Sequence, residues 1–504
     1  MTKLYKKLHR WPGLILSFFL FYYALSGIIL NHRELLSSID IKRSNLPANY
    51  EYHNWNNAAL KGNIIINRDS VLIYGNIGIW LTDSLFKDFK PFYSGFPKGI
   101  DNRKIFDIHR TDDGHLYAAA FSGLYAYNKS LQKWERLNTG KKSGRFVGID
   151  NVGDTLYAAN RSYLFNGISD GVNTVLTRIE LAPPVGYVNK VTWFQTLWQI
   201  HSGEIFGIPG KIYVDIIGVI TIFLSISGMI WFFFPGWIKK RLKVKKKART
   251  ITRVGGWSLK WHNIVGSWTF ILLVITFLTG MFLRPPLLIA IANAKVSPLK
   301  YSHLDQPNPW YDKFRDILYD GNTGRFLLST SEGMYHMERE DLMLVKYEVQ
   351  PPVSIMGINV FENSADSSYL TGSFSGIFSW SPEKRSVIDL HTGKPYAPVS
   401  IGRPVGEILV SGMIADCQGN RYVVEYNNGI IPFYHSYEFP QMPENILTAS
   451  KMSLWSVCLE FHTGRIFQTI VSDFYILIVP LVGLTGIIIV ISGYLLWRRK
   501  FRKK

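Results

Sequence analysis

Cysteine is almost absent from this chain, and its scarcity argues against several kinds of redox chemistry. Only Cys417 and Cys458 occur among 504 residues, and neither belongs to a Cys-x-x-Cys pair. Thiol redox pairs, iron–sulfur clusters and covalently attached c-type haem rely on that kind of spacing, so the sequence speaks against all three. A disulfide between the two cysteines stays open, because sequence alone does not say which loops meet.

Signatures of nucleotide binding and hydrolysis are missing as well. The stretch Val254-Gly255-Gly256 has neither the Gly-x-Gly-x-x-Gly spacing nor the βαβ context of a dinucleotide site. The chain also has no P-loop, no nucleophile elbow and no run of zinc ligands. We therefore expect no flavin or nicotinamide site, and hydrolase or ATP-driven transport functions have no support.

Acidic residues are lacking from the segments that carry the excess positive charge. The net charge is +19, yet residues 1–10, 236–260 and 498–504 hold 20 of the 56 basic side chains and no acid. The rest of the chain has 36 basic and 37 acidic residues and is nearly neutral. Each basic segment flanks an apolar stretch, which is the pattern of the cytoplasmic side of a membrane protein and excludes nucleic acid as a partner.

Four apolar stretches are long enough to cross a bilayer, which takes about 20 helical residues. They cover residues 11–30, 213–234, 264–283 and 475–497. The basic flanks predict that both termini and the 236–260 loop are cytoplasmic and that the two long segments between spans lie outside. The first stretch is too long for a signal-peptide core and lacks a small-residue cleavage site, so we expect a retained span in contact with membrane lipid.

The two halves of the chain repeat the same motifs. At a constant offset of 253 residues, His9, Gly13, Ser26 and Gly27 match His262, Gly266, Thr279 and Gly280. Ahead of the second and fourth stretches, His201-Ser-Gly-Glu-Ile-Phe206 matches His462-Thr-Gly-Arg-Ile-Phe467, and Ser227-Gly228 later matches Ser492-Gly493. Both halves enter from the cytoplasm, so we expect a four-helix transmembrane bundle with a pseudo-twofold axis along the membrane normal.

Turn-and-strand units recur in the two outer segments. Phe121-Ser-Gly-Leu-Tyr125 reads as a tight turn between strands and returns 253 residues later as Phe374-Ser-Gly-Ile-Phe378. The units are spaced about 40–50 residues apart, which is the period of four-stranded propeller blades. We expect a membrane α plus extracytoplasmic β fold, with one β-propeller-like domain taking about three blades from each segment. Two separate small β domains are the alternative.

Four histidines recur at matched positions near the ends of the spans. His9 and His262 lie at the cytoplasmic ends, His201 and His462 lie on the outer side, and a twofold axis would make each pair face across the bundle. Facing neutral imidazoles suit the two axial positions of a haem iron, and Gly13 leaves room on the helix face of His9. The alternative is that the duplication preserved hydrogen-bonded structural histidines that bind no metal.

His32 and Arg10 are secondary candidates. His32 follows His9 by a helical rise of about 34 Å and so reaches the outer side, where it would be a further ligand or a propionate partner. Arg10 could neutralise haem propionates at the inner site or serve as an ordinary membrane anchor. Pro209 is expected to break the helix after His201 and to leave that histidine on a surface turn or short helix.

The motif residues resemble the PepSY-associated transmembrane helix family. The resemblance rests on residues 8–14 and 25–27, on the His-Ser-Gly motif with its flank at 201–210 and on the second copy at 461–467. It implies a bacterial inner-membrane protein of the iron-regulated or siderophore-reductase kind, with haem b held by the four spans. No PepSY module is recognisable, and Gln468 stands where the first copy has Gly207.

The expected function is that of a haem b electron-transfer protein carrying one or two haems. Quinol or a cytoplasmic reductase would supply electrons, and a periplasmic ferric chelate or siderophore would receive them. Hard oxygen ligands hold ferrous iron less tightly than ferric iron, so the reduction would release the iron for uptake. The alternatives are a membrane-anchored periplasmic binding or sensor module without redox activity and, more weakly, a permease.

The expected organisation has seven parts in chain order. The N-terminus with the first span covers 1–32, the first outer β-rich segment covers 33–200, and the His-Ser-Gly motif with the second span covers 201–235. The basic cytoplasmic loop covers 236–260 and the third span covers 261–284. The second outer β-rich segment covers 285–460, and the His-Thr-Gly motif with the fourth span and the basic tail covers 461–504.

Overall fold

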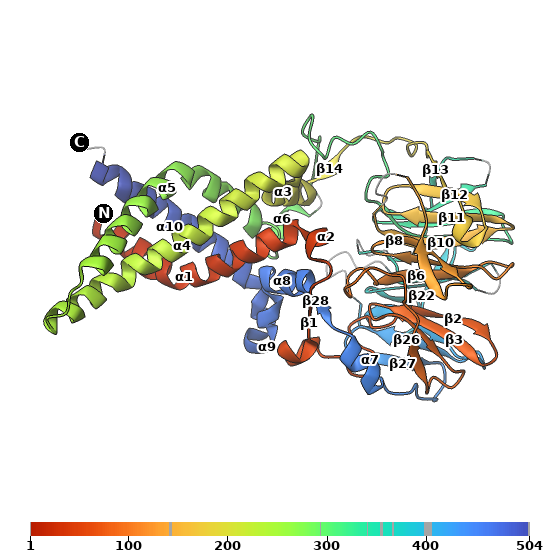
Figure 1. The fold of residues 1–504 in the computed structure, drawn as a ribbon. Coiled ribbons are helices and arrows are strands. Elements are labelled where there is room, and N and C mark those ends of the chain that lie inside the picture. Colours follow the sequence, from red (N-terminus) through yellow and green to blue (C-terminus); the bar gives the residue numbers. More distant parts are fainter. Residues whose placement is uncertain are drawn as a thin grey trace. The chain divides into compact units, whose positions relative to one another are not determined.

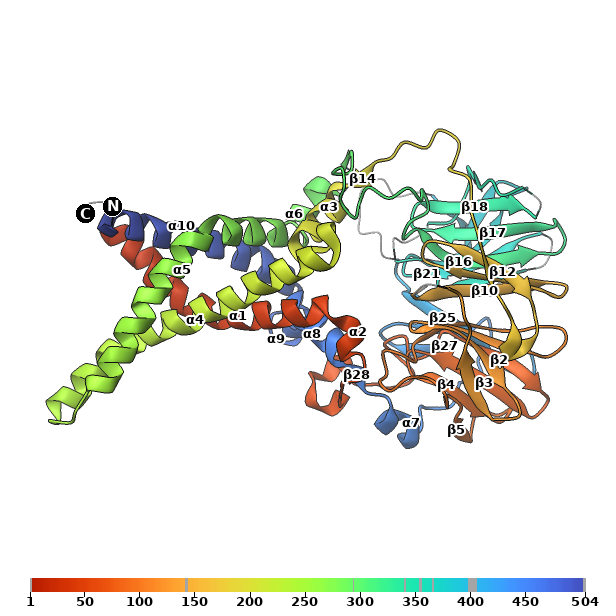
Figure 2. The same ribbon diagram turned by 45° about the horizontal axis from the view of Figure 1, so that its top comes forward.

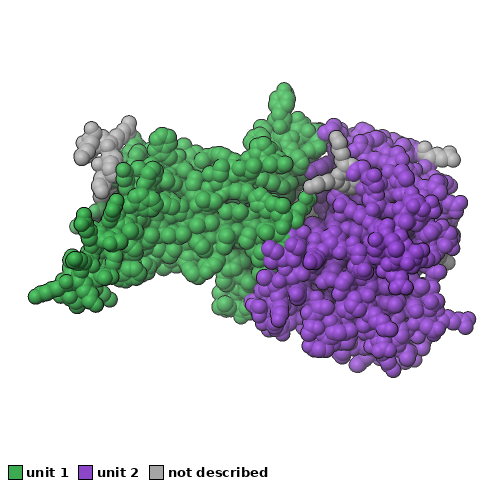
Figure 3. Space-filling model, in the orientation of Figure 1, with its two compact units in different colours: residues 1–36, 188–306, 454–504 green, residues 37–187, 307–453 purple. Residues whose placement is uncertain are grey.

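A computed structural model of the chain describes residues 2–140, 144–292, 294–339, 341–352, 356–364, 367–397 and 406–501. The chain forms two compact units, each assembled from separate stretches of sequence (Figure 3). The helical unit comprises Met1–Leu36, Val188–Gln306 and Leu454–Lys504, and the β unit comprises Ser37–Tyr187 and Pro307–Ser453. The end of the expected basic tail, residues 502–504, lies outside the described residues.

In the described part of the helical unit, four long helices form the core (Figure 1), and each is long and apolar enough to span a bilayer. They are α1 (Thr2–Asn31), α4 (Gly207–Lys243), α5 (Arg249–Met281) and α10 (Ile478–Phe501). The basic segment 236–260, expected as a loop, is largely helical, because α4 and α5 leave only residues 244–248 between them. Lysine and arginine are good helix formers, so the helices continue past their apolar parts.

The four helices pack as an antiparallel bundle (Figure 2). Both α1 and α5 pack against α4 and α10, so α1 and α5 stand diagonally opposite each other. Small residues bring the backbones close: a Cβ at Gly218 of α4 would lie 3.0 Å from Cγ1 of Ile28 on α1. Side chains on α1 and α5 can therefore meet in the interior of the bundle.

A short helix precedes α4 and another precedes the last span. These are α3 (Trp193–Ser202) and α8 (Leu454–His462). The left-handed Gly203 directly follows α3, and the left-handed Gly464 lies two residues after α8. Gly203 has φ of 78°, and a Cβ there would lie 2.1 Å from the carbonyl oxygen of Gly210, so only glycine fits. The helix is broken at Gly203 and not at Pro209, because Pro209 lies in the first turn of α4, where its missing N–H breaks no helical hydrogen bond.

The smaller elements of both units complete the fold. The helical unit also contains α2 (Arg33–Leu36), α6 (Leu287–Ile291), α9 (Gln468–Val471) and the strand pair β14 (Val191–Thr192) and β15 (Lys295–Val296). The β unit also contains α7 (Glu444–Ala449) and the strand pair β1 (Asp40–Ile41) and β28 (Met452–Ser453).

Among the residues that the structure describes, six antiparallel sheets of three to five strands make up the rest of the β unit. The first segment forms three sheets: β2 (Gly62–Asn67), β3 (Ser70–Gly75), β4 (Gly78–Thr82) and β5 (Phe89–Pro91); β6 (Ile105–Arg110), β7 (Leu116–Ala120), β8 (Gly123–Asn128) and β9 (Lys133–Arg136); β10 (Phe146–Val152), β11 (Thr155–Asn160), β12 (Leu164–Ile168) and β13 (Thr177–Ile179). The second segment forms the other three: β16 (Phe314–Asp320), β17 (Arg325–Thr330), β18 (Gly333–Glu338) and β19 (Val345–Lys346); β20 (Val360–Asn363), β21 (Tyr369–Ser373), β22 (Gly376–Ser381), β23 (Ser386–Asp389) and β24 (Lys394–Pro395); β25 (Val410–Ala415), β26 (Arg421–Glu425) and β27 (Gly429–Phe433).

Neighbouring sheets contact one another in cyclic order. The first strands touch in the sequence β2, β6, β10, β16, β20, β25 and back to β2. Six clusters of buried apolar side chains lie between successive sheets, including one that joins the first sheet to the sixth. Polar side chains add links between first strands: Asp107 accepts from the backbone N–H of Ile149 at 2.8 Å, and Asp150 accepts from that of Tyr319 at 2.6 Å.

Candidate functional site

His9 and His262 meet inside the bundle, at the end where the chain begins. His9 lies on α1 and His262 on α5, and their ring centres are 6.1 Å apart with an angle of 72° between the ring planes. Because these two helices stand diagonally, the rings face each other across the bundle. The structure thus brings together the two histidines expected to form the inner pair.

Hydrogen bonds to Nδ1 hold both inner rings. The Nδ1–H of His9 donates to the carbonyl oxygen of Ile489 at 2.9 Å. The Nδ1–H of His262 donates to Oγ of Ser227 at 2.8 Å, because that hydroxyl itself donates to the carbonyl oxygen of Leu224. A neutral imidazole that donates from Nδ1 has its lone pair on Nε2, which is the atom a metal ion would bind.

His201 and His462 form a second pair towards the other ends of the long helices. His201 lies in the last turn of α3 and His462 in that of α8, and their ring centres are 6.0 Å apart with an interplanar angle of 55°. The Nδ1 of His462 lies 3.1 Å from the carbonyl oxygen of Tyr23 and 3.0 Å from Oγ of Ser26. The Nδ1 of His201 lies 3.1 Å from the carbonyl oxygen of Thr276, so both outer rings also leave Nε2 free.

Every one of the four rings lies against a glycine of a long helix. A Cβ added at Gly493 would lie 2.7 Å from Cε1 of His9, and one at Gly280 would lie 2.7 Å from Cε1 of His201. A Cβ at Gly27 would lie 3.3 Å from His462, and one at Gly228 would lie 3.5 Å from His262. The glycines expected to leave room for a macrocycle, Gly13 and Gly266, are different residues, and that expectation stays a prediction. Gly13 and Gly266 face Ile489 at 3.9 Å and Leu224 at 3.6 Å.

The contacts of the histidines repeat in the two halves of the chain. The carbonyls that accept from the outer rings, Tyr23 and Thr276, are 253 residues apart, and so are Gly27 and Gly280. Sequence reasoning recorded the Ser-Gly and Thr-Gly doublets as marks of the duplication but did not assign them to the histidines. Their recurrence was the available signal: Ser26, Ser227 and Thr279 each carry a hydroxyl near a histidine Nδ1, and the glycine of every doublet makes space for a ring.

His32 and Arg10 make contacts with residues outside the two pairs. The Nε2 of His32 is 2.7 Å from Oδ2 of Asp215 on α4, and the side chain of Asn31 donates to Oδ1 of the same carboxylate at 3.0 Å. The guanidinium of the exposed Arg10 lies 5.0 Å from the ring centre of Phe232. His32 thus has its Nε2 engaged by a carboxylate, and Arg10 packs as a surface cation at the end of the bundle.

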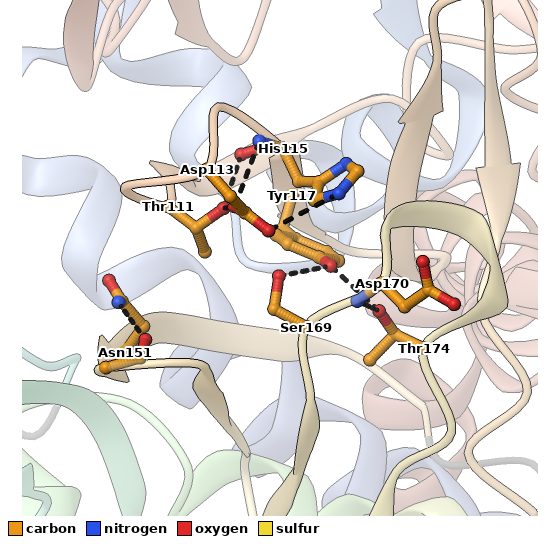
Figure 4. Close-up of polar contacts among 9 residues, drawn as sticks. Thr111, Asp113, His115, Tyr117, Asn151, Ser169, Asp170 and Thr174 are labelled. Carbon is orange, nitrogen blue, oxygen red and sulfur yellow. Dashed lines mark hydrogen bonds and ion pairs between the residues drawn. The ribbon is translucent and has the colours of Figure 1, made fainter.

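Histidines of the β unit take part in local hydrogen bonding. Figure 4 shows His115 beside Asp113, with Nε2 and Oδ2 3.4 Å apart, at the turn before β7. Nearby, the hydroxyl of Tyr117 contacts Oγ of Ser169 at 2.9 Å and Oγ1 of Thr174 at 2.8 Å. These groups satisfy one another within the second and third sheets, so they hold turns together.

A second group of titratable residues lies among the first strands of the β unit. Burial, and then the nearby Arg145, lowers the pKa of Lys61 to about 8, and Nζ of Lys61 donates to Oδ1 of Asn359 at 2.9 Å. Burial, and then the neighbouring Asp107, raises the pKa of Asp316 well above its ordinary value. Asp107 accepts from the backbone N–H of Ile149 in the next sheet, whereas Asp316 accepts from Ile317 on its own strand, so Asp107 has a structural role in joining two sheets.

Comparison with known families assigns the helical unit. The model of the family described as the PepSY-associated TM region matches residues 6–500, nearly the whole chain. The chain belongs to the PepSY-associated TM region family. The family resemblance of the His-Ser-Gly motifs is thereby confirmed, and the protein is a membrane protein with four apolar helices. No curated protein matches it.

Solved structures resemble the chain only distantly. One is the extracellular domain of a protein described as a hybrid two-component system from B. thetaiotaomicron, with 12% identity and a TM-score of 0.34 over 77% of this chain and 40% of that one. Another is a protein of unknown function from Bacteroides thetaiotaomicron, with 10% identity and a TM-score of 0.35 over 78% and 74%. The chain thus spans two fifths of the first relative, and TM-scores this low establish no shared fold.

Proposed function

We propose that this member of the PepSY-associated TM region family is a haem b electron-transfer protein. In this proposal it spans the bacterial inner membrane and reduces a ferric chelate or siderophore on the periplasmic side. The observation that carries the proposal is the presence of two facing histidine pairs inside one apolar helix bundle, with ring centres 6.1 Å and 6.0 Å apart.

The geometry of each pair fits a haem iron between the rings. A metal–imidazole nitrogen bond is about 2 Å long, so two rings on opposite sides of one metal ion have centres about 6 Å apart. Two imidazoles are too few for a structural zinc ion, which takes four protein ligands. Among the described residues, no cluster of three or more His, Cys, Asp or Glu side chains could hold a metal ion. Haem needs only two axial ligands from the protein.

The residues around the rings would orient the ligands and exclude water. In this proposal His9 and His262 hold the inner haem, and His201 and His462 hold the outer one. Carbonyl and hydroxyl groups bound to Nδ1 fix each ring and raise its basicity as a ligand. When bound, each haem supplies a one-electron ferric/ferrous couple. The inner level at His9 and the outer level at Tyr23 are 14 residues apart on α1, about 21 Å along the helix.

The remaining parts of the proposal follow the charge pattern and the cyclic order of the sheets. The basic ends of the long helices would face the cytoplasm, where quinol or a separate reductase delivers electrons. We propose that the six sheets are the blades of one β-propeller that binds the acceptor. Its support is the cyclic order of first strands and the apolar clusters that join the third sheet to the fourth and the sixth to the first.

Visible spectroscopy of the purified protein tests the function. We expect oxidised and dithionite-reduced spectra typical of b-type haem, and a pyridine haemochrome titration approaching two haems per chain. His9→Ala should remove one haem and His462→Ala the other, while His391→Ala, on an exposed turn of the β unit, should remove neither. A colourless protein after expression with ample haem would refute the proposal and favour an anchored binding module.

A further inference from the structure

The outer histidine pair has buried polar groups beside it whose hydrogen-bonding capacity is unused. The ring of Tyr23 lies 5.4 Å from that of His462, and its hydroxyl is buried with no hydrogen-bond partner. The Nε atoms of Arg284, which follows α5, and of Arg465, in the second histidine motif, are also buried and have no partner. Donors buried in this way cost free energy unless an acceptor reaches them.

These groups carry more positive than negative charge. Arg284 lies within electrostatic reach of Arg465, Glu460, Tyr23 and Tyr475. Glu460 forms an ion pair with the far end of Arg465, so one carboxylate faces two guanidinium groups. Two like charges in a partly buried site repel each other, and an additional anion between them would relieve the repulsion.

The matching positions of the first half have different residues that already satisfy one another. The counterpart of Arg284 at offset 253 is Asn31, which donates to Asp215. The counterpart of Arg465 in the first histidine motif is Glu204, whose carboxylate lies 3.4 Å from Nζ of Lys211. The repeated fold therefore does not require the cationic group, which belongs to one side of the outer pair only.

We infer that Tyr23, Arg284 and Arg465 form a carboxylate-binding site for the propionates of the haem between His201 and His462. The inference rests on the proposed function and adds an orientation, with the propionate edge of the outer haem on the side of Arg284. Guanidinium groups match the geometry of carboxylates and bind them in charge-assisted pairs. A phosphate of a lipid headgroup would present the same anionic chemistry, so the test must separate the two sources.

The reduction potential of the outer haem in the full-length protein gives the first test. The outer haem is identified as the one missing from His462→Ala. Arg284→Gln should lower its midpoint potential, because loss of a nearby positive charge favours the ferric state. Arg284→Lys should keep most of the potential, and Lys211→Gln, on the matched side, should leave it unchanged. An unshifted potential in Arg284→Gln, or an equal shift in Lys211→Gln, would overturn the inference.

Reconstitution with haem b or with its dimethyl ester identifies the source of the anion. The wild-type outer site should prefer haem b, and Arg284→Gln should lose roughly tenfold of that preference. If the wild type and Arg284→Gln prefer haem b over its dimethyl ester equally, the anion comes from lipid and the inference is overturned. The proposed function would still stand on the number of haems bound per chain. A retained inner haem shows that the variant is folded. A protein that binds no haem in either form would refute both proposals.

Discussion

Single residues in the bundle set how closely the histidine rings approach the helices. The rings of His9 and His201 rest on Gly493 and Gly280, where one added carbon would come within 2.7 Å of the ring. The positions of the rings therefore depend on the absence of a side chain at these glycines. Carbonyl groups on the same helices hold each Nδ1, so a displaced ring would lose its hydrogen bond as well.

Alanine at Gly493 should empty the proposed inner haem site. The new methyl group would displace the ring of His9, and we expect Gly493→Ala to lose one of the two haems in a pyridine haemochrome titration. Gly256→Ala, on α5, is the control, because its methyl group would meet no atom within 4 Å. If the two variants retain equal amounts of haem, the ring does not depend on this contact.

Among the elements, the first strands of the β unit hold carboxylates in contrasting surroundings. On strand β16, Asp316 has a raised pKa because of burial and of Asp107. Asp320 lies on the same strand and is also partly buried, but hydrogen bonds from Tyr369 and Thr323 lower its pKa. One strand therefore carries two aspartates whose ionisation affects stability in opposite directions.

Neutralising these two aspartates should change stability with opposite signs. In the folded protein, Asp316 keeps its proton at pH values above 3.8, the ordinary pKa of an aspartate, at which the unfolded chain has lost it. The wild type therefore loses stability as the pH rises from about 4 towards the raised pKa. Asp316→Asn avoids this loss and should gain melting temperature relative to wild type from about pH 4 to neutral pH.

Asp320→Asn supplies the control. Its carboxylate stabilises the fold above the ordinary value, and that contribution is lost as the pH falls, so this variant should melt lower at neutral pH and approach the wild type in acid. Thermal unfolding followed between pH 4 and 8 measures both. The same sign of change in the two variants would contradict the assignment.

In the whole molecule, two units share one chain that passes between them repeatedly. All four paired histidines and their glycines lie in the helical unit, and both long β segments combine in the other unit. The two cysteines are free, with Cys417 exposed in the β unit and Cys458 buried in the helical unit. Chemical labelling of a native thiol can test the membrane orientation inferred from the basic segments.

A membrane-impermeant maleimide should label Cys417 in intact spheroplasts. Burial, and then the nearby Asp416 and Asp69, raises the pKa of the Cys417 thiol, so labelling is best done at mildly alkaline pH. Cys417→Ser should abolish the signal. In that background, Lys245→Cys, placed between α4 and α5, should react only after permeabilisation. Labelling of Lys245→Cys in intact spheroplasts would reverse the orientation.

The sequence by itself determined the features that depend on composition and repetition. Four spans could be predicted because a bilayer demands a long apolar run, and their basic flanks are visible without any structure. The histidine pairs followed from the duplication, because two parallel copies place matched residues opposite each other. The His-Ser-Gly motif identified the family, as the match over residues 6–500 confirms.

Only the tertiary structure decided which groups touch the histidines. It placed His32 on Asp215, brought Gly493 of another helix against the ring of His9, and moved the helix break from Pro209 to Gly203. The cyclic contacts of the six sheets likewise join strands that are distant in sequence. The physical reason is that hydrophobic period and charge are local properties of the chain, whereas these contacts depend on how separate helices and strands pack against each other.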